Sequence, residues 1–227
     1  METSLHRALK DHYAADAQSR EVPIGSYRID AVAGGRLIEI QHGALAAIRD
    51  KVAELLTEHR VSVVKPIVVR KTLVKQDRRG GEIVGRRLSP KRGRPIDLFN
   101  DLIHFLNVFP HRRLILEAPL VEIEEYRYPG HGKRRRWRAG DFQIEDQRLV
   151  AITDVFRFRR ATDLAALIPC PLPKTFDTGD LAEGLDIRRW EAQRIAYCLR
   201  KTGVFRQAGK RGNTLLYRWT KRVRQAA

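Results

Sequence analysis

Apolar residues in the first third of the chain switch between two spacings, one typical of helices and one typical of strands. Leu5, Leu9 and Tyr13 recur every four residues, as they do along one face of a helix, whereas the residues around Leu37 and Glu39 alternate one by one. The predicted elements are, in order, a helix, a hairpin or bent strand, a strand, a long helix and a buried strand that runs into a longer one: residues 2–16, 21–32, 36–41, 44–59 and 61–74. This order predicts a mixed α/β fold.

The middle of the chain continues this pattern around two basic insertions. A Gly-rich basic excursion occupies residues 76–94, and a basic tip at 130–138 separates two β-rich runs, so we expect a hairpin loop at the tip. The other elements are a predicted helix, a β-rich run and a segment whose pattern fits either a strand or a helix: residues 95–106, 114–126 and 149–158.

Three prolines within five residues, Pro169, Pro171 and Pro173, interrupt the chain and predict a domain boundary. A short helix, a longer helix and two strands are predicted after it: residues 178–184, 188–202 and 206–219. The predicted organisation is an α/β domain with a basic β-rich extension, a linker and a small C-terminal domain: residues 1–168 (extension about 76–168), 169–175 and 176–227.

Charge is the first property that narrows the function. Lys plus Arg number 44 against 27 Asp plus Glu, a net charge of +17. Folding does not require that excess, and self-repulsion makes it mildly unfavourable, so a polyanionic partner such as nucleic acid is the natural explanation. A ribosome-like basic protein or a binder of anionic membranes would share this charge.

Several other classes of protein find no support in the sequence. Cys170 and Cys198 are too few for a disulfide framework and lack metal-ligand spacing, and the seven histidines show no zinc pattern. Ser4 has no identifiable triad partner, so an acyl-transfer hydrolase finds no support. Without a secretory signal or an apolar run near the roughly 20 residues of a membrane span, we expect a cytoplasmic protein that does not enter membranes.

An acidic constellation spans the predicted Gly-Gly turn at residues 34–35. Asp30 ends one predicted strand, while Glu39 and Gln41, two residues apart in the next, project from one face. Two convergent carboxylates and a nearby backbone carbonyl form an oxygen-rich site that suits Mg²⁺ or Mn²⁺, an ion that can polarise a phosphate and activate water. Ordinary ion pairs of these acids with Arg28 or Arg36 are the alternative reading.

Here the chain resembles the PD-(D/E)XK nuclease superfamily over about residues 1–74. The matching residues are Tyr27-Arg-Ile-Asp30 and Leu37-Ile-Glu39-Ile-Gln41, between an N-terminal helix and an amphipathic one. The resemblance implies a restriction-endonuclease-like mixed sheet flanked by helices, with Asp30 and Glu39 as metal ligands. A glutamate on the first helix often assists in that family, and Glu2 is the matching position.

The chain departs from the family motif at two positions. Ile29 replaces the motif proline, and Gln41 replaces the lysine that positions water and offsets charge on the phosphate. Some members of the family keep activity with Gln, and others carry the lysine on a neighbouring element, for which Lys51 and Lys65 are candidates. An inactive descendant that only binds nucleic acid is the alternative.

Residues 175–219 resemble a winged helix-turn-helix, with 188–202 as the recognition helix and a wing after it. Apolar residues on this helix form a core stripe, which leaves a polar face suited to phosphates and base edges: Arg188, Arg189, Gln193 and Arg194. Lys210 and Arg211 at the wing tip suit contacts with the nucleic-acid backbone. Small winged helices also serve as dimerisation or docking modules.

A second basic run lies in the predicted hairpin tip, as either a phosphate clamp or a solvated loop: Lys133, Arg134, Arg135 and Arg136. Together these features predict a Mg²⁺- or Mn²⁺-dependent endonuclease that hydrolyses phosphodiester bonds in DNA, with Asp30, Glu39 and Gln41 as catalytic residues. A non-catalytic DNA-binding or regulatory protein on the same scaffold, and an RNA-directed nuclease or binder, are the alternatives. A homodimer stays open, because many nucleases cut two strands as dimers.

Overall fold

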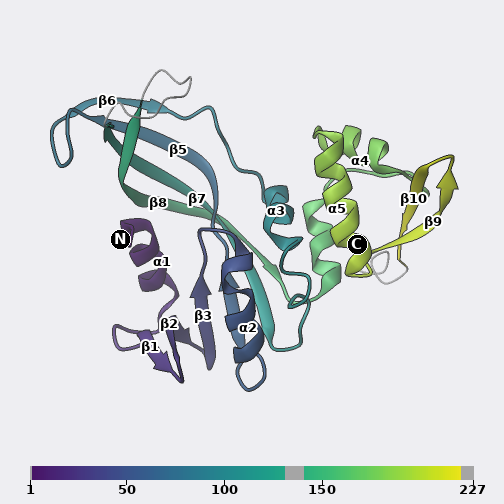
Figure 1. Ribbon diagram of the computed structural model, residues 1–227, viewed down its shortest axis with the longest axis horizontal. Helices are drawn as coiled ribbons and strands as arrows, with labels where there is room; N and C mark the ends of the chain where they lie inside the picture. The colour runs from purple at the N-terminus through teal and green to yellow at the C-terminus, as the bar shows by residue number, and fades with distance from the viewer. Residues whose placement is uncertain (1, 131–140, 221–227) are drawn as a thin grey trace. The chain divides into compact units, whose positions relative to one another are not determined.

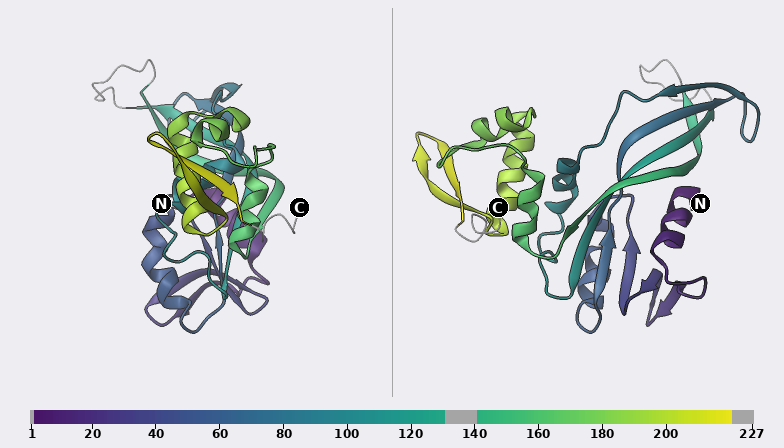
Figure 2. Two further views of the ribbon diagram at one scale, coloured as in Figure 1. Left: turned by 90° about the vertical axis from the view of Figure 1, so that its right-hand side faces the viewer. Right: turned by 180° about the vertical axis from the view of Figure 1, so that it is seen from behind.

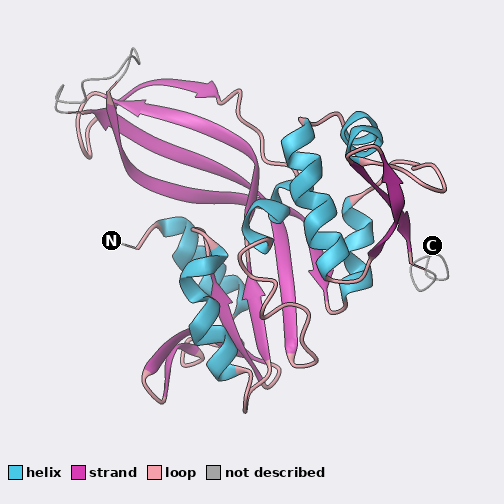
Figure 3. Ribbon diagram, turned by 45° about the vertical axis from the view of Figure 1, so that its right-hand side comes forward, coloured by secondary structure: helices cyan, strands magenta, loops and turns pink. Residues whose placement is uncertain are grey.

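The computed structural model describes residues 2–130 and 141–220 and has a mixed α/β architecture. An eight-stranded sheet is flanked by helices, and a separate two-stranded sheet lies near the C-terminal end of the chain (Figures 1 and 3). The predicted mixed sheet with flanking helices is therefore confirmed. None of the helices in residues 2–130 and 141–220 is long and apolar enough to cross a membrane.

The large sheet combines parallel and antiparallel strands. Its main path runs β1-β2-β3-β4-β7-β5-β6, and β8 pairs with β7 off this path. The pairs β1–β2, β2–β3 and β5–β6 are antiparallel, whereas β5 and β7 are parallel. The strands are β1 (Arg20–Ile24), β2 (Tyr27–Ala33), β3 (Arg36–Ile40), β4 (Val61–Val64), β5 (Ile67–Gln76), β6 (Ile83–Leu88), β7 (Leu114–Pro129) and β8 (Phe142–Phe158), and β9 (Phe205–Arg211) with β10 (Thr214–Trp219) in the small sheet.

The helices lie where the apolar periodicity predicts them, with shorter ends. The α-helices are α1 (Ser4–Tyr13), α2 (Arg49–Leu55), α3 (Phe99–Leu102), α4 (Thr178–Leu185) and α5 (Arg189–Lys201). Short 3-10 helices precede α2 and α3 and follow β8: Leu45–Ile48, Pro95–Leu98 and Ala161–Leu167. The predicted helices over 44–59 and 95–106 thus each begin with a 3-10 turn.

Glycines set the first two turns of the sheet. Gly25, between β1 and β2, has a φ of +57°, and Gly34 and Gly35, between β2 and β3, have φ values of +56° and +67°. Only glycine adopts these angles at little cost. The glycines at these positions therefore predict the turns of both hairpins correctly. The undecided segment at 149–158 is the end of strand β8.

The basic excursion predicted over residues 76–94 contains strand β6, which the apolar pattern did not predict. All six residues of β6 are exposed, so its sequence has no alternation between a buried and a solvated face, and the strand signal is lost. The predicted hairpin tip falls almost wholly in residues 131–140, outside the described residues. Strands β7 and β8, on either side of it, do pair.

The chain folds as two compact units built from interleaved segments. The first contains residues 1–42, 64–94 and 118–156, and the second contains 43–63, 95–117 and 157–227. The boundary predicted at residues 169–175 falls inside the second unit. Both α4 and α5 therefore share a unit with segments from the first half of the chain.

Helix α1 covers one face of the first unit's sheet (Figure 1). The hydroxyl of Thr3 accepts a hydrogen bond from the His6 amide at 3.3 Å and caps the helix start. Leu5 and Leu9 are fully buried and pack with Ala31 of β2 and with isoleucines of β3. This packing holds the polar side of α1 beside the end of the β2–β3 ladder.

In the second unit, Phe176, just before α4, forms an aromatic cluster with residues of the β9–β10 hairpin. The rings of Phe176 and Phe205 lie 5.0 Å apart, and those of Phe205 and Trp219 lie 4.7 Å apart. Asp177 caps α4 by accepting hydrogen bonds from the amides of Gly179 and Asp180. The predicted succession of two helices and two strands is confirmed.

We expect Leu9→Ala to lower the free energy of unfolding by about 2–5 kcal/mol, because it leaves a cavity under α1. Leu88→Ala, at a residue that is 48% exposed, should change it by less than about 0.5 kcal/mol. Urea denaturation followed by circular dichroism measures both. Equal effects of the two substitutions would contradict the assigned packing of α1.

Candidate functional site

A polar pocket of about 460 Å³ opens beside α1 in the first unit. Three of its ionisable residues are four positions apart and so share one side of the helix and its N-terminal extension: Glu2, His6 and Lys10. The other lining residues come from the start of the helix, from β1, from the segment just after β3 and from β8: Thr3, Glu21, His42 and Gln147. The pocket is therefore built by segments that are distant in sequence.

Asp30 of β2 connects α1 to strand β3 at the edge of this pocket. Its Oδ1 lies 3.1 Å from His6 Nε2, and its Oδ2 accepts the Ile40 amide hydrogen at 2.8 Å. The pairing of β2 with β3 includes Ala31 opposite Ile38, and one more step in that register would set Asp30 opposite Glu39. The Asp30 carboxylate thus lies against the peptide that joins Glu39 to Ile40.

The carboxylate of Asp30 is stabilised in its ionised form. Burial alone would raise its pKa, but the hydrogen bonds from His6 and the Ile40 amide, with the nearby charges of His6 and Lys10, outweigh burial and lower the pKa. Asp30 is therefore an anion at neutral pH. An anion fixed by an amide and a helix is a preorganised ligand for a cation.

Lys10 supplies a cation at the centre of the acidic residues. Its Nζ lies 2.6 Å from Glu2, 2.7 Å from Glu21 and 3.9 Å from Asp30 Oδ1. The residue is only 6% exposed. Burial would lower its pKa, but the bonds to Glu2 and Glu21 outweigh burial and raise the pKa, so Lys10 stays protonated.

His42 brings a neutral imidazole to the same pocket. Its ring centroid lies 5.7 Å from that of His6. Burial, followed by the positive charges of His6 and Lys65, lowers the pKa of His42 to about 4. Its Nε2 is buried and has no hydrogen-bond partner in the described part of the chain. A buried ring nitrogen without a protein partner is a group that a bound ligand would satisfy.

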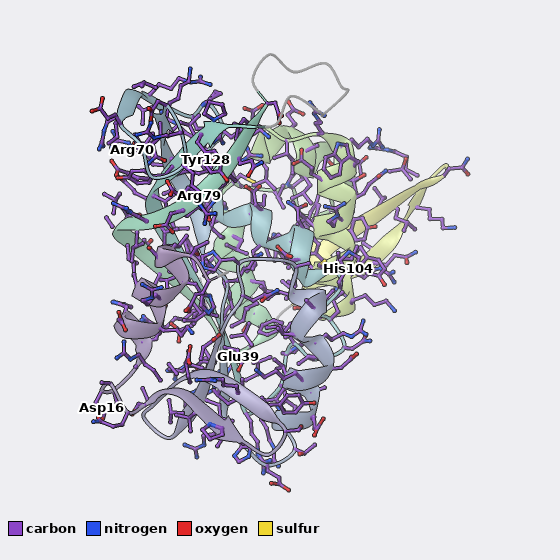
Figure 4. The ribbon with its side chains drawn as sticks, turned by 60° about the vertical axis from the view of Figure 1, so that its left-hand side comes forward. Asp16, Glu39, Arg70, Arg79, His104 and Tyr128 are labelled. Atoms are coloured by element: carbon purple, nitrogen blue, oxygen red, sulfur yellow. The ribbon has the colours of Figure 1, made fainter. Side chains whose placement is uncertain are left out.

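The predicted catalytic residues occupy distinct positions around Asp30. Glu39 lies in β3 (Figure 4) and is 4% exposed. Gln41 follows directly after β3, and its backbone amide donates a hydrogen bond to the carbonyl of Val64 at 2.9 Å. Glu2 shares both of its partners, His6 and Lys10, with Asp30. The structure therefore joins Asp30 with Glu2 through side chains and with Glu39 through the backbone.

Within residues 2–130 and 141–220, no group of three or more His, Cys, Asp or Glu side chains is arranged to hold a metal ion. The expected magnesium site consists of two carboxylates and a backbone carbonyl, and it stays a prediction. Its two carboxylates, from Asp30 and Glu39, are hard oxygen donors of the kind that Mg²⁺ prefers.

The two candidate replacement lysines lie in different units. Lys65 donates from Nζ to the carbonyl of His42 at 2.9 Å, beside the pocket, and Lys51 belongs to α2 in the second unit. Lys10 contacts the acids directly, and our sequence analysis missed it. The available signal was the spacing of Glu2, His6 and Lys10, which forms a polar stripe next to the buried leucines of α1.

The predicted nucleic-acid-binding residues of the second unit belong to α5 and its start and to strand β9. Arg188, Arg189, Gln193 and Lys210 are exposed. Arg194 lies 5.0 Å over the ring of Trp190 and hydrogen-bonds to Asn100, so it is partly engaged. Arg211 pairs with Asp177 at 2.6 Å while its side chain stays 72% exposed. Arg134, Arg135 and Arg136 lie outside the described residues.

Comparison with known proteins covers most of the chain. A family model described as "Domain of unknown function (DUF8091)" matches residues 3–159. An "Uncharacterized protein" of Treponema pallidum (strain Nichols) is 30% identical over 219 residues, which cover 96% of this chain and 85% of the relative. No solved structure matches the chain. The matched family segment includes His6, Lys10, Asp30 and His42.

We expect the His42 imidazole to titrate with a midpoint of about 4, measured by NMR. An ordinary histidine has a pKa of about 6.5, so between these pH values the unfolded chain binds the proton more readily than the folded one. The contribution of His42 to folding stability is therefore full above about pH 6.5 and is lost as the pH falls toward 4.

The variant His6→Asn tests the cause of this shift. It removes one positive charge that lowers the His42 pKa, so the midpoint should rise. A His42 midpoint near 6.5 in the unmodified protein would contradict the assigned burial.

Proposed function

We propose that this chain, which belongs to the family described as "Domain of unknown function (DUF8091)", is a metal-dependent endonuclease that hydrolyses phosphodiester bonds in DNA. The observation that carries this proposal is the ionised Asp30, held between His6 of α1 and the peptide that follows Glu39. A carboxylate fixed at the end of an antiparallel ladder, beside a second acid, is suited to bind a divalent cation.

The residues of the pocket fit such a cation in charge and in donor type. Lys10 contacts Glu2 and Glu21, and Arg28 also pairs with Glu21, so two basic groups face two of the acids. Asp30 Oδ1 lies 3.9 Å from Lys10 Nζ, farther than the oxygens of Glu2 and Glu21, so Lys10 balances the charge of Asp30 least and leaves it to act on a ligand. Each oxygen of Asp30 accepts one hydrogen bond and keeps a further lone pair.

Asp30 and Glu39 would hold Mg²⁺ or Mn²⁺, with Glu2 as the third candidate ligand. The bound ion would supply charge on the phosphate and a water of lowered pKa. The protein's own side chains would position the attacking water and the positive charge near the phosphate. Gln41 would orient the attacking water, and Lys10 would provide the positive charge that the family motif normally places at the Gln41 position.

Basic surfaces support a polyanionic substrate. The net charge of +17 favours association with nucleic acid. In the second unit, α4, α5 and the β9–β10 hairpin follow the order of a winged helix-turn-helix, which we propose as a DNA-binding module. Arg189 and Gln193 on the exposed face of α5 would contact phosphates and base edges, and Lys210 of β9 would contact the nucleic-acid backbone.

A DNA-binding protein that does not cut is the second candidate. It is favoured by Gln41 in place of the motif lysine and by the ion pairs of Lys10, which balance acidic charge from within the chain. An RNA-directed nuclease or binder has the same electrostatic basis.

Cleavage of supercoiled plasmid with Mg²⁺ or Mn²⁺ tests the first candidate. We expect Asp30→Asn and Glu39→Gln each to reduce the nicking rate by about a hundredfold or more, because each removes a group proposed to act at the reacting phosphate. Binding, measured separately without metal, should persist. Asp11→Asn removes an exposed carboxylate from the same helix as His6 and Lys10 and serves as the matched control.

A pair of lysine variants tests the role of Lys10. Lys10→Met should reduce nicking by about tenfold or more because the charge beside the acids is lost, whereas Lys51→Met should not. The reverse result would assign the missing lysine to α2. Binding without cleavage by the unmodified protein in either metal would reject the nuclease and favour the second candidate.

A further inference from the structure

A second pocket of the first unit, about 550 Å³ in volume, lies on strands β5–β8. These strands are neighbours in the sheet and run alongside one another in the right-hand view of Figure 2, and Figure 4 labels Arg70, Arg79 and Tyr128 in this region. Basic and aromatic side chains dominate the pocket lining: Lys75, Arg86, Arg87, Arg127, Tyr128 and Phe142. Asp141 also lines it. The pocket therefore combines positive charge with ring surfaces.

The strand register explains why a hollow forms here. Lys75 of β5 lies between Gly85 of β6 and Arg127 of β7. Gly85 has no side chain, and a Cβ added there would meet no atom within 4 Å. In the row Gly85–Lys75–Arg127, two cationic side chains therefore lie beside the space that a side chain at position 85 would fill.

The cation and the ring beside this hollow are held in place by neighbours. Arg127 donates from Nε to Glu125 Oε1 at 2.6 Å, and its guanidinium carbon lies 3.9 Å from the Phe142 ring centroid. The hydroxyl of Tyr128 donates to Gln143 Oε1 at 2.6 Å. Phe142 remains 39% exposed. An aromatic surface is thus presented to solvent in a fixed position.

Two of the basic side chains are available to a ligand. Arg86 pairs with Glu124, and Arg127 pairs with Glu125. Among the described residues, no carboxylate forms an ion pair with Lys75 or Arg87. Unpaired cations beside an exposed ring match the two recurring parts of single-strand binding sites, a phosphate contact and a stacking platform.

We propose that this pocket binds an unpaired nucleotide of single-stranded nucleic acid. The base stacks on Phe142 and Tyr128, and the adjacent phosphates contact Arg87 and Lys75. A paired duplex buries its base faces in the stack and cannot make the aromatic contact, so the pocket favours unpaired regions. The inference rests on the proposed function, because it requires a chain that binds nucleic acid.

Fluorescence anisotropy tests the proposal with a labelled single-stranded oligonucleotide and a duplex of the same sequence, in EDTA and at one salt concentration. Phe142→Ala should weaken single-strand binding by about tenfold, because base stacking on an aromatic side chain contributes roughly that much. Phe142→Trp keeps a ring surface and should retain binding. Far-UV circular dichroism verifies that each variant is folded.

Charge controls separate the pocket from the general basicity of the chain. Arg87→Ala should weaken single-strand binding by about fivefold or more. Arg49→Ala removes the same charge from the second unit and should change it by less than about twofold. Unchanged single-strand binding in the Phe142→Ala and Arg87→Ala variants, or equal losses on duplex, overturns the pocket assignment alone. Failure of the unmodified protein to bind either nucleic acid overturns the proposed function.

Discussion

The carboxylate of Asp30 is the group on which the first unit's polar site depends. It joins His6 on α1 to the Ile40 amide on β3, at the point where the β2–β3 ladder ends. A half-buried carboxylate without partners would be costly, and here hydrogen bonds and nearby charge keep it ionised. Leucines on the adjacent stripe of α1 are fully buried, so apolar packing and this ionic contact fix the same helix.

That arrangement gives the chain an acidic site within a strongly basic protein. Three carboxylates, from Glu2, Glu21 and Asp30, surround the Lys10 ammonium. Basic charge elsewhere favours approach of a polyanion, while the acidic pocket would receive a cation and one phosphate of the bound strand. The proposed single-strand pocket on β5–β8 adds a second contact to this attraction of charge, because its aromatic rings would stack on an unpaired base.

Local sequence signals predicted most elements and part of the site. A turn glycine or a periodic leucine fixes the conformation of only a few neighbouring residues. The sequence therefore predicts the hairpins and α1 correctly. Strand β6 was missed because it is exposed on both faces and has no alternation. Lys10 was missed because it lies off the apolar stripe of α1, a position that usually faces solvent. Its burial arises from packing against β1 and β2, and such contacts between distant segments leave no local pattern in the sequence.

Diffraction from crystals grown with DNA and Mn²⁺, recorded at the manganese absorption edge, would test the central claim most directly. The account predicts an anomalous peak within coordination distance of both the Asp30 and Glu39 carboxylates, next to a phosphate oxygen. Lys10 would remain close enough to neutralise the adjacent acids. DNA bound with no manganese peak at Asp30, or with Glu39 directed away from it, would contradict a metal-dependent reaction at this site.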